Sequence, residues 1–137
     1  MTTGSDVVLD ASAFVDLVIE SSRPAPRVGP RLRLAQAWLV PGTFDAEVIS
    51  AFRRRRQRGD DPPRLLAELP RILESAPLAR VVTAALNRRI VELHPNMSSF
   101  DAGYVALAEA LQLPLLTTDG RLARAPGSRC RIELLAG

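Results

Sequence analysis

Short apolar runs alternate along the chain with longer segments in which apolar residues recur every three or four positions. The short runs have the length of buried strands, and the longer segments have the spacing of amphipathic helices. Strands are predicted at 6–9, 37–40, 79–82, 114–117 and 131–135, and helices at 12–20, 43–58, 65–73, 86–93 and 99–111. Strands that alternate with helices predict an α/β, three-layer domain with a mainly parallel five-stranded sheet flanked by helices.

Proline and glycine mark the breaks between these segments. The segment 21–30 contains three prolines and one glycine, which predicts a loop or a broken helix. Gly59 is expected to end the helix 43–58 in the left-handed conformation. Pro70 lies inside the helix predicted at 65–73, and we expect it to kink or split that helix.

The composition is typical of a folded domain rather than a disordered or membrane-spanning chain. A length of 137 residues with 47% hydrophobic residues predicts a single domain over 1–137 with its own core. No apolar run approaches the roughly 20 residues of a membrane span, and the N-terminus lacks the pattern of a signal peptide. Cys130, the one cysteine, cannot form an internal disulfide, and its apolar surroundings predict a small buried residue. A reducing cytoplasm is therefore the expected location.

Four carboxylates are predicted to gather at one edge of the sheet. Asp10 and Asp119 follow predicted strands, and Glu47 and Asp101 lie in the first turns of predicted helices. In a parallel α/β sheet this edge contains the crevice that binds ligands. Each acid also has a structural explanation when it is taken alone, because acids at these positions cap helices or interact favourably with the helix dipole.

Four carboxylates in one crevice repel one another, and without compensation some of them take up protons. A hard divalent cation such as Mg²⁺ removes this conflict. The chain has one histidine, His94, and one cysteine, so it lacks the ligands of a zinc site, and His94 is better explained as a helix-end residue. An acidic Mg²⁺ site suits phosphodiester hydrolysis, because the metal lowers the pKa of a bound water that a carboxylate can orient or deprotonate. The absence of glycine-rich phosphate loops and of a Gly-x-Ser-x-Gly motif argues against nucleotide-binding ATPases, dehydrogenases and serine hydrolases.

Four segments, in order along the chain, resemble the motifs of PIN-domain ribonucleases. They are 7–13, 41–48, 100–108 and 115–122, and they contain Asp10, Glu47, Asp101 and Asp119, respectively. In size the chain is similar to the VapC-type toxins of bacterial and archaeal toxin–antitoxin pairs. The residue before the third acid is often tyrosine in this family and is Phe100 here, which removes a hydroxyl and is expected to keep the packing.

The resemblance implies a PIN-like fold and a metal-dependent endoribonuclease toxin. Asp10, Glu47, Asp101 and Asp119 would hold one or two Mg²⁺ or Mn²⁺ ions. Ser12 and Thr117 would support the acids or the metal-bound waters by hydrogen bonds, although helix capping and strand packing explain these two residues equally well. Hydrolysis would leave a 5′-phosphate and a 3′-hydroxyl, with tRNA or rRNA as the substrate. A cognate antitoxin would hold the toxin inactive, and family precedent favours a homodimer.

A dense basic block follows Glu47 on the same predicted helix. All 18 basic residues of the chain are arginines, a bias that is also typical of a GC-rich genome, and five of them form this block: Arg53, Arg54, Arg55, Arg56 and Arg58. Arginine binds phosphate well, so the block predicts contacts with RNA or a partner protein, but cations also suit a helix C-terminus. Aromatic residues are few, so RNA recognition is expected to depend on shape and phosphate contacts. Two alternatives stay open: a PIN fold that binds RNA or protein without turnover, and a nuclease for single-stranded DNA.

Overall fold

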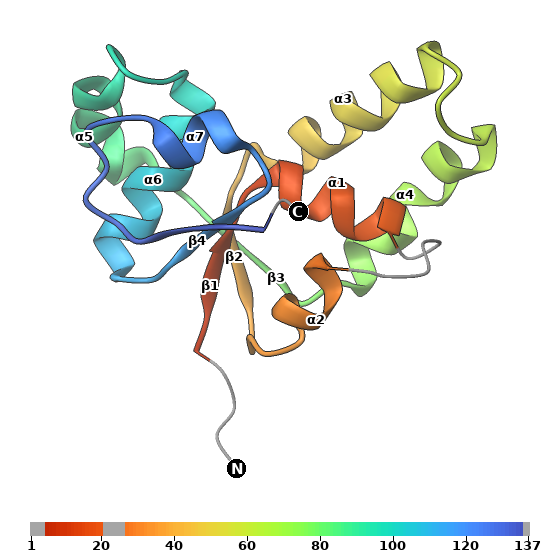
Figure 1. Ribbon diagram of the computed structural model, residues 1–137, viewed down its shortest axis with the longest axis horizontal. Coiled ribbons are helices and arrows are strands. Elements are labelled where there is room, and N and C mark those ends of the chain that lie inside the picture. The colour runs from red at the N-terminus through yellow and green to blue at the C-terminus, as the bar shows by residue number, and fades with distance from the viewer. Residues whose placement is uncertain (1–4, 21–26, 136–137) are drawn as a thin grey trace.

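A computed structural model describes residues 5–20 and 27–135, and its five strands form one sheet (Figure 1). Neighbouring strands are parallel, and their spatial order is β3-β2-β1-β4-β5. The strands are β1 (Val7–Leu9), β2 (Trp38–Pro41), β3 (Leu78–Val81), β4 (Leu115–Thr117) and β5 (Ile132–Leu134). The predicted parallel five-stranded sheet is confirmed.

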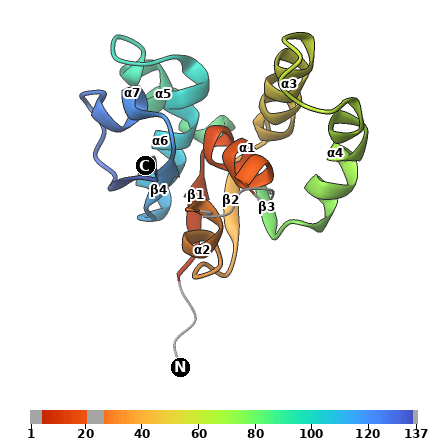
Figure 2. The same ribbon diagram turned by 45° about the vertical axis from the view of Figure 1, so that its right-hand side comes forward.

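Helices cover both faces of this sheet, which gives the three layers that the sequence predicts (Figures 1 and 2). One group lies on the side of α6, which contacts β1, β2 and β4, and the other lies on the side of α1. A paired arm made of α3 and α4 projects beyond the sheet. The helices are α1 (Ala11–Glu20), α2 (Val28–Leu32), α3 (Phe44–Gln57), α4 (Pro63–Ser75), the 3₁₀ turn η1 (Ala84–Leu86), α5 (Asn87–Leu93), α6 (Ser99–Leu111) and α7 (Gly120–Arg124).

The helix α2 lies where a loop or a broken helix was expected. Residues 21–26 of that predicted segment are outside the described residues, whereas 28–32 are helical. The cause is Glu20, which is only 4% exposed and whose carboxylate accepts hydrogen bonds from the Val28 and Gly29 amides. These contacts satisfy amides at the start of α2, where the helix itself supplies no acceptor.

Proline and glycine have different effects in the α3–α4 arm. Gly59 has a φ of 76° and ends α3 in the left-handed region, as predicted. The expected split at Pro70 is wrong, because α4 continues across it. Pro70 lies on the exposed side of α4, while Leu69 and Leu73 on its inner side are buried in the core and hold the helix in place.

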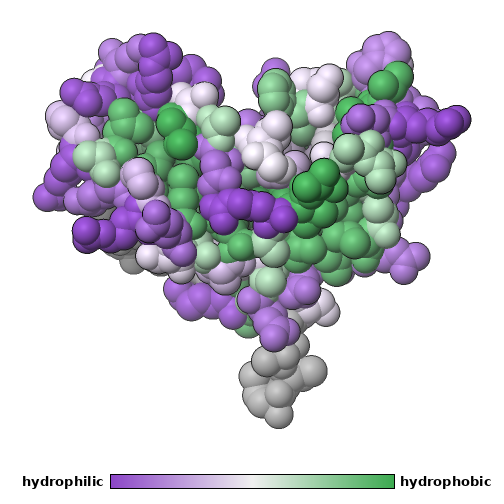
Figure 3. Space-filling view, turned by 180° about the vertical axis from the view of Figure 1, so that it is seen from behind, coloured by the Kyte–Doolittle hydropathy of each residue, from purple (hydrophilic) through white to green (hydrophobic). Residues whose placement is uncertain are grey.

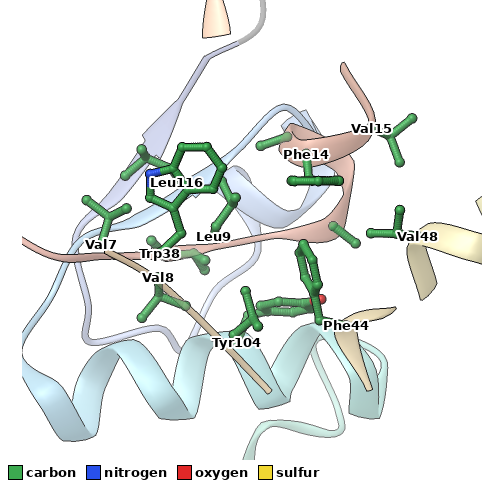
Figure 4. Packing of buried hydrophobic residues seen from close by; sticks show 14 of the residues in the cluster. Val7, Val8, Leu9, Phe14, Val15, Trp38, Phe44, Val48, Tyr104 and Leu116 are labelled. Carbon is green, nitrogen blue, oxygen red and sulfur yellow. The ribbon is translucent and has the colours of Figure 1, made fainter. Parts of the chain in front are cut away.

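The core lies on both sides of β1, as Figure 4 shows. Val8 and Leu9 are completely buried, which explains why this strand is a continuous apolar run rather than an alternating one. On the α1 side, the ring of Phe14 makes edge-to-face contacts with Phe44 at 5.4 Å and with Trp38 at 6.4 Å between ring centroids. The core thus fixes α1, β2 and α3, which begin or end beside the carboxyl end of β1.

Two further expectations concern solvent and membrane exposure. Cys130 is half-buried rather than buried, because it precedes β5, an edge strand that has a neighbour on one side only. Within residues 5–20 and 27–135, no helix combines the length and the apolar character that a membrane crossing requires.

Candidate active site

The four predicted acids line one cleft at the carboxyl edge of the sheet. Asp10 follows β1 directly, Asp119 is the N-cap of α7, and Glu47 and Asp101 lie in the first turns of α3 and α6. The cleft has a volume of about 600 Å³, which is within the range of small-ligand sites. Residues from four separate parts of the chain therefore meet at the position where parallel α/β sheets bind ligands.

Asp10 is the most buried of these acids, with 5% of its surface exposed. The hydroxyls of Ser12 and Thr117 both donate to its Oδ2, at 2.5 and 2.7 Å. The same hydroxyls accept hydrogen bonds from the amides of Thr118 and Asp119, at 3.3 and 3.0 Å. This network joins the end of β1 to the end of β4 and fixes the orientation of the Asp10 carboxylate.

Glu47 is held from two sides. The hydroxyls of Thr43 and Tyr104 donate to its Oε2, at 3.0 and 3.1 Å. Tyr104 is completely buried in α6, and burial raises the pKa of its phenol above its usual value, so it remains a proton donor. Tyr104 was not among the predicted site residues; the signal that could have identified it is that a buried tyrosine hydroxyl needs a polar partner.

Asp101 and Asp119 take part in helix capping as well as in the cleft. The Asp101 amide donates to the hydroxyl of Ser98, the N-cap of α6, at 3.2 Å. The carboxylate of Asp119 accepts from the Arg121 amide at 2.9 Å. Capping and the cleft position are compatible, because a carboxylate has two oxygens.

Burial raises the pKa of Asp10, Glu47 and Asp101 above the ordinary values of these acids. Repulsion adds to this effect: Asp119 acts on Asp10, and Asp10 acts on both Glu47 and Asp101. Hydrogen bonds from the neighbouring hydroxyls oppose the rise in pKa without cancelling it. The cleft therefore concentrates negative charge that its own residues do not fully compensate.

The donor atoms of this cleft fit a hard divalent cation. Across the described ranges, no group of three or more His, Cys, Asp and Glu side chains is arranged so that it could hold a metal ion. Mg²⁺ does not require such a cage, because it binds one or two carboxylates and keeps several waters. His94 is exposed, caps the C-terminal end of α5 and lies outside the cleft, so its interpretation as a helix-end residue is confirmed.

Comparison with known proteins agrees with this geometry. The sequence model of the PIN domain matches residues 7–128. The chain belongs to the PIN-domain family. Ribonuclease VapC12 of Mycobacterium tuberculosis is 39% identical over 132 residues, which cover 95% of this chain and 99% of that protein, so the chain is a VapC-type member.

Two solved structures have the same fold as this PIN-domain chain. PAE2754 from Pyrobaculum aerophilum superimposes with a TM-score of 0.63 at 20% identity, covering 95% of this chain and 83% of that one. VapC20 from Mycobacterium tuberculosis, described as a toxin that cleaves the sarcin–ricin loop, gives a TM-score of 0.61 at 18% identity, covering 88% and 93%. At these identities the likeness shows the fold alone.

The arginine block of this PIN-domain chain divides into two groups. Arg55 donates to both oxygens of Asp61, at 2.7 and 2.9 Å, and Arg58 donates to Asp60 at 3.0 Å, so these two arginines tie α3 to the following turn. The other three, Arg53, Arg54 and Arg56, are exposed and have no carboxylate partner among the described residues. Arg54 also lines the acidic cleft, seven residues or about two turns after Glu47 on α3.

Two more residues of the cleft differ from their expected roles. Asp16 was not among the predicted site residues, yet it lines the cleft, because it lies one turn after Ser12 on the same face of α1. Phe100 was expected to keep the packing of the usual tyrosine, and this is wrong. The side chain of Phe100 is 57% exposed and lines the cleft beside Asp101.

Proposed function

We propose that this VapC-type chain is a metal-dependent endoribonuclease toxin. It would cut RNA phosphodiester bonds with Asp10, Glu47, Asp101 and Asp119, which would hold Mg²⁺ or, in its place, Mn²⁺, directly or through the waters that the ion keeps. The observation that carries the proposal is the meeting of these four carboxylates in one cleft, three of them with a raised pKa. The name of VapC12, a ribonuclease at 39% identity, supports RNA as the substrate.

A divalent cation in the cleft would neutralise charge at the phosphate and lower the pKa of a bound water. Asp10 suits a cation ligand, because Ser12 and Thr117 fix its carboxylate and leave it little freedom to lose on binding. Glu47 also suits a cation ligand or the orientation of a metal-bound water, because the hydroxyls of Thr43 and Tyr104 fix its carboxylate. Arg54 would bind a phosphate of the same RNA strand, while Arg53 and Arg56 extend the positive surface toward the end of α3.

The partners in this proposal follow from VapC-type membership. A cognate antitoxin would occupy the toxin and hold it inactive, the toxin would form a homodimer in the cytoplasm, and tRNA or rRNA would be the target. Co-expression with the protein encoded directly upstream should restore growth of cells that the chain arrests, and the two proteins should then co-purify.

The decisive experiment uses the purified chain with RNA and Mg²⁺ or Mn²⁺. We expect cleavage that leaves 5′-phosphates, that stops when a chelator is added, and that is lost in Asp10→Asn and Asp101→Asn. Circular dichroism and thermal unfolding check that both variants fold, and single-stranded DNA of the same sequence tests the alternative substrate. A folded wild-type chain that cuts no RNA with either metal, or cell toxicity that survives Asp10→Asn, would contradict the proposal.

A further inference from the structure

One aromatic side chain of this molecule is placed unlike the others. The chain has four phenylalanines, one tyrosine and one tryptophan, and all six lie within the described residues. Phe100 is 57% exposed, whereas the other five are at most 8% exposed: Phe14, Trp38, Phe44, Phe52 and Tyr104. The fold buries every aromatic ring except the one beside Asp101.

Exposure of an apolar residue alone says little, since aliphatic side chains are exposed elsewhere on the surface. Apolar side chains also cover a broad area of the face seen from behind (Figure 3). The other exposed large apolar residues are Leu34, Ile49, Val82, Val91, Leu111 and Leu134, and none of them lines the acidic cleft. Phe100 differs from all of these in carrying an aromatic face and in lining the cleft.

The ring of Phe100 contributes little to the stability of the fold. The ring contacts of the described residues join Phe14 to Trp38 and to Phe44, and Phe100 takes part in neither. Its backbone lies in the first turn of α6, so its position relative to Asp101 is fixed while its side chain faces solvent. A ring of this kind is free to contact a ligand in the cleft.

We propose that the Phe100 ring stacks on the base of a nucleotide adjacent to the bond that is cut. This inference rests on the proposed nuclease function and adds a residue that holds the substrate at the cleft. A phosphate bound near Asp101 carries a base within reach of the neighbouring side chain, and every base has a π face that an aromatic ring can stack on. Bases inside a duplex are already stacked on one another, whereas bases in loops and single strands are accessible.

Arg54 gives the same strand a second contact. It lines the cleft from α3, whereas Phe100 lines it from α6, and its guanidinium would bind the backbone rather than a base. Backbone contacts are insensitive to the presence of a base, so the two contacts can be separated by experiment. A probe that retains the backbone and lacks the bases keeps the Arg54 contact and loses the Phe100 contact.

The test measures binding of three probes to the Asp10→Asn variant in Mg²⁺, so that no probe is cut. The probes are a single-stranded oligoadenylate, its duplex with oligouridylate, and an abasic ribose-phosphate chain of equal length. Adding Phe100→Ala should weaken oligoadenylate binding by about 5- to 100-fold and leave abasic binding unchanged. Phe100→Tyr and Phe100→Trp should bind like the parent. Phe100→Leu is the matched control, because it keeps apolar volume without an aromatic face, and it should bind like Phe100→Ala.

Several results would overturn the stacking proposal. One is that Phe100→Leu binds oligoadenylate as tightly as the parent. Another is that Phe100→Ala loses the same affinity for all three probes. A third is that the parent binds the single strand no more tightly than the duplex. Cleavage by the wild-type chain is scored separately. Cleavage without a base-dependent effect of Phe100 overturns stacking and leaves the nuclease intact. Base-dependent binding by a chain that cuts no RNA overturns the nuclease and supports stacking. Thermal unfolding midpoints close to the parent's verify that the variants are folded.

Discussion

Carboxylates occur in two contrasting settings in this molecule, inside the cleft and on the flanks of the fold. On the flanks, four carboxylates meet guanidinium groups that bind both of their oxygens. The pairs are Asp45 with Arg80, Asp61 with Arg55, Glu109 with Arg89, and Glu133 with Arg31. In the cleft, the one guanidinium of the described residues within 4.0 Å of the four acids is that of Arg121, which lies 3.9 Å from Asp119 and is 91% exposed, where an ion pair contributes little.

Two acids of the flanks and three of the cleft have pKa values that are shifted in opposite directions. Arg80 lowers the pKa of Asp45, and Arg31 lowers that of Glu133. In the cleft, burial and mutual repulsion raise the pKa of Asp10, Glu47 and Asp101. A chain with 18 arginines thus pairs these four acids on its flanks and leaves those in the cleft without a close, fixed counter-ion. The paired flank acids tie elements of the fold together, whereas the cleft acids would, under the proposed function, bind a mobile cation.

The largest expected effect comes from comparing two acids in the same first turn of α3. Glu47 lines the cleft, while Asp45 pairs with Arg80 outside it. Glu47→Gln should lower the rate of RNA cleavage by at least about 100-fold, because loss of even an outer-shell partner of a metal ligand costs 10- to 100-fold. Asp45→Asn should leave the rate within a few-fold of wild type while lowering the thermal unfolding midpoint.

Single-turnover cleavage at saturating Mg²⁺, together with unfolding midpoints for both variants, measures this contrast. Equal losses of activity in the two variants would show that α3 responds to any change in its first turn. The distinction between cleft and flank acids would then fail for this helix.

The second prediction compares two neighbouring arginines of the basic block. Arg54 faces the cleft, and Arg55 is bound to Asp61. Arg54→Ala should weaken RNA binding by about tenfold at low salt and reduce the slope of log K against log salt by about 0.7, because one phosphate contact is lost. Arg55→Ala should keep that slope and lower the free energy of unfolding by about 1 kcal/mol, because it leaves Asp61 half-buried without its partner. Equal salt slopes in both variants would contradict the division of the block.

The sequence predicts those features of the site that depend on local patterns, such as where a strand ends or a helix begins. The ends of β1 and β4 place Asp10 and Asp119 at the same edge, and the apolar spacing gives the bounds of α6. The solvent exposure of the Phe100 side chain, by contrast, depends on how α6 packs against the sheet, which local spacing does not specify.

Contacts between distant segments were not predictable in the same way. The hydrogen bond from Tyr104 to Glu47 spans 57 positions, and the division between Arg54 and Arg55 depends on where the turn after α3 places Asp61. Spacing fixes which face of a helix a residue occupies, but the direction in which that face points is set by packing.

The smallest expected effect is a difference in stability in the absence of metal. In a chelator at pH 7, Asp10→Asn should unfold at a temperature a few degrees higher than wild type, which corresponds to a change on the order of 1 kcal/mol. The substitution removes a buried charge that Asp119 repels, and the asparagine amide oxygen can still accept hydrogen bonds from Ser12 and Thr117. Saturating Mg²⁺ should reverse the order, because it binds and stabilises the wild-type cleft.

The pH dependence of this difference separates cleft acids from flank acids. The pKa of Asp10 is raised above 3.8, so the folded state holds the proton more tightly than the unfolded state, and stability falls as pH rises through the folded pKa. Lowering the pH from 7 toward 3.8 should therefore abolish the advantage of Asp10→Asn. The pKa of Asp45 is lowered, so its contribution is present above 3.8 and is lost as pH falls through the folded pKa. The penalty of Asp45→Asn should accordingly persist down to about pH 3.8, where the Asp10 effect has already disappeared, and be lost only below it. Thermal unfolding of both variants in chelator across this range tests the contrast.

An Asp10→Asn variant that is less stable than wild type at pH 7 would show that the carboxylate is already compensated within the cleft. That result would remove the reason to expect a bound cation there.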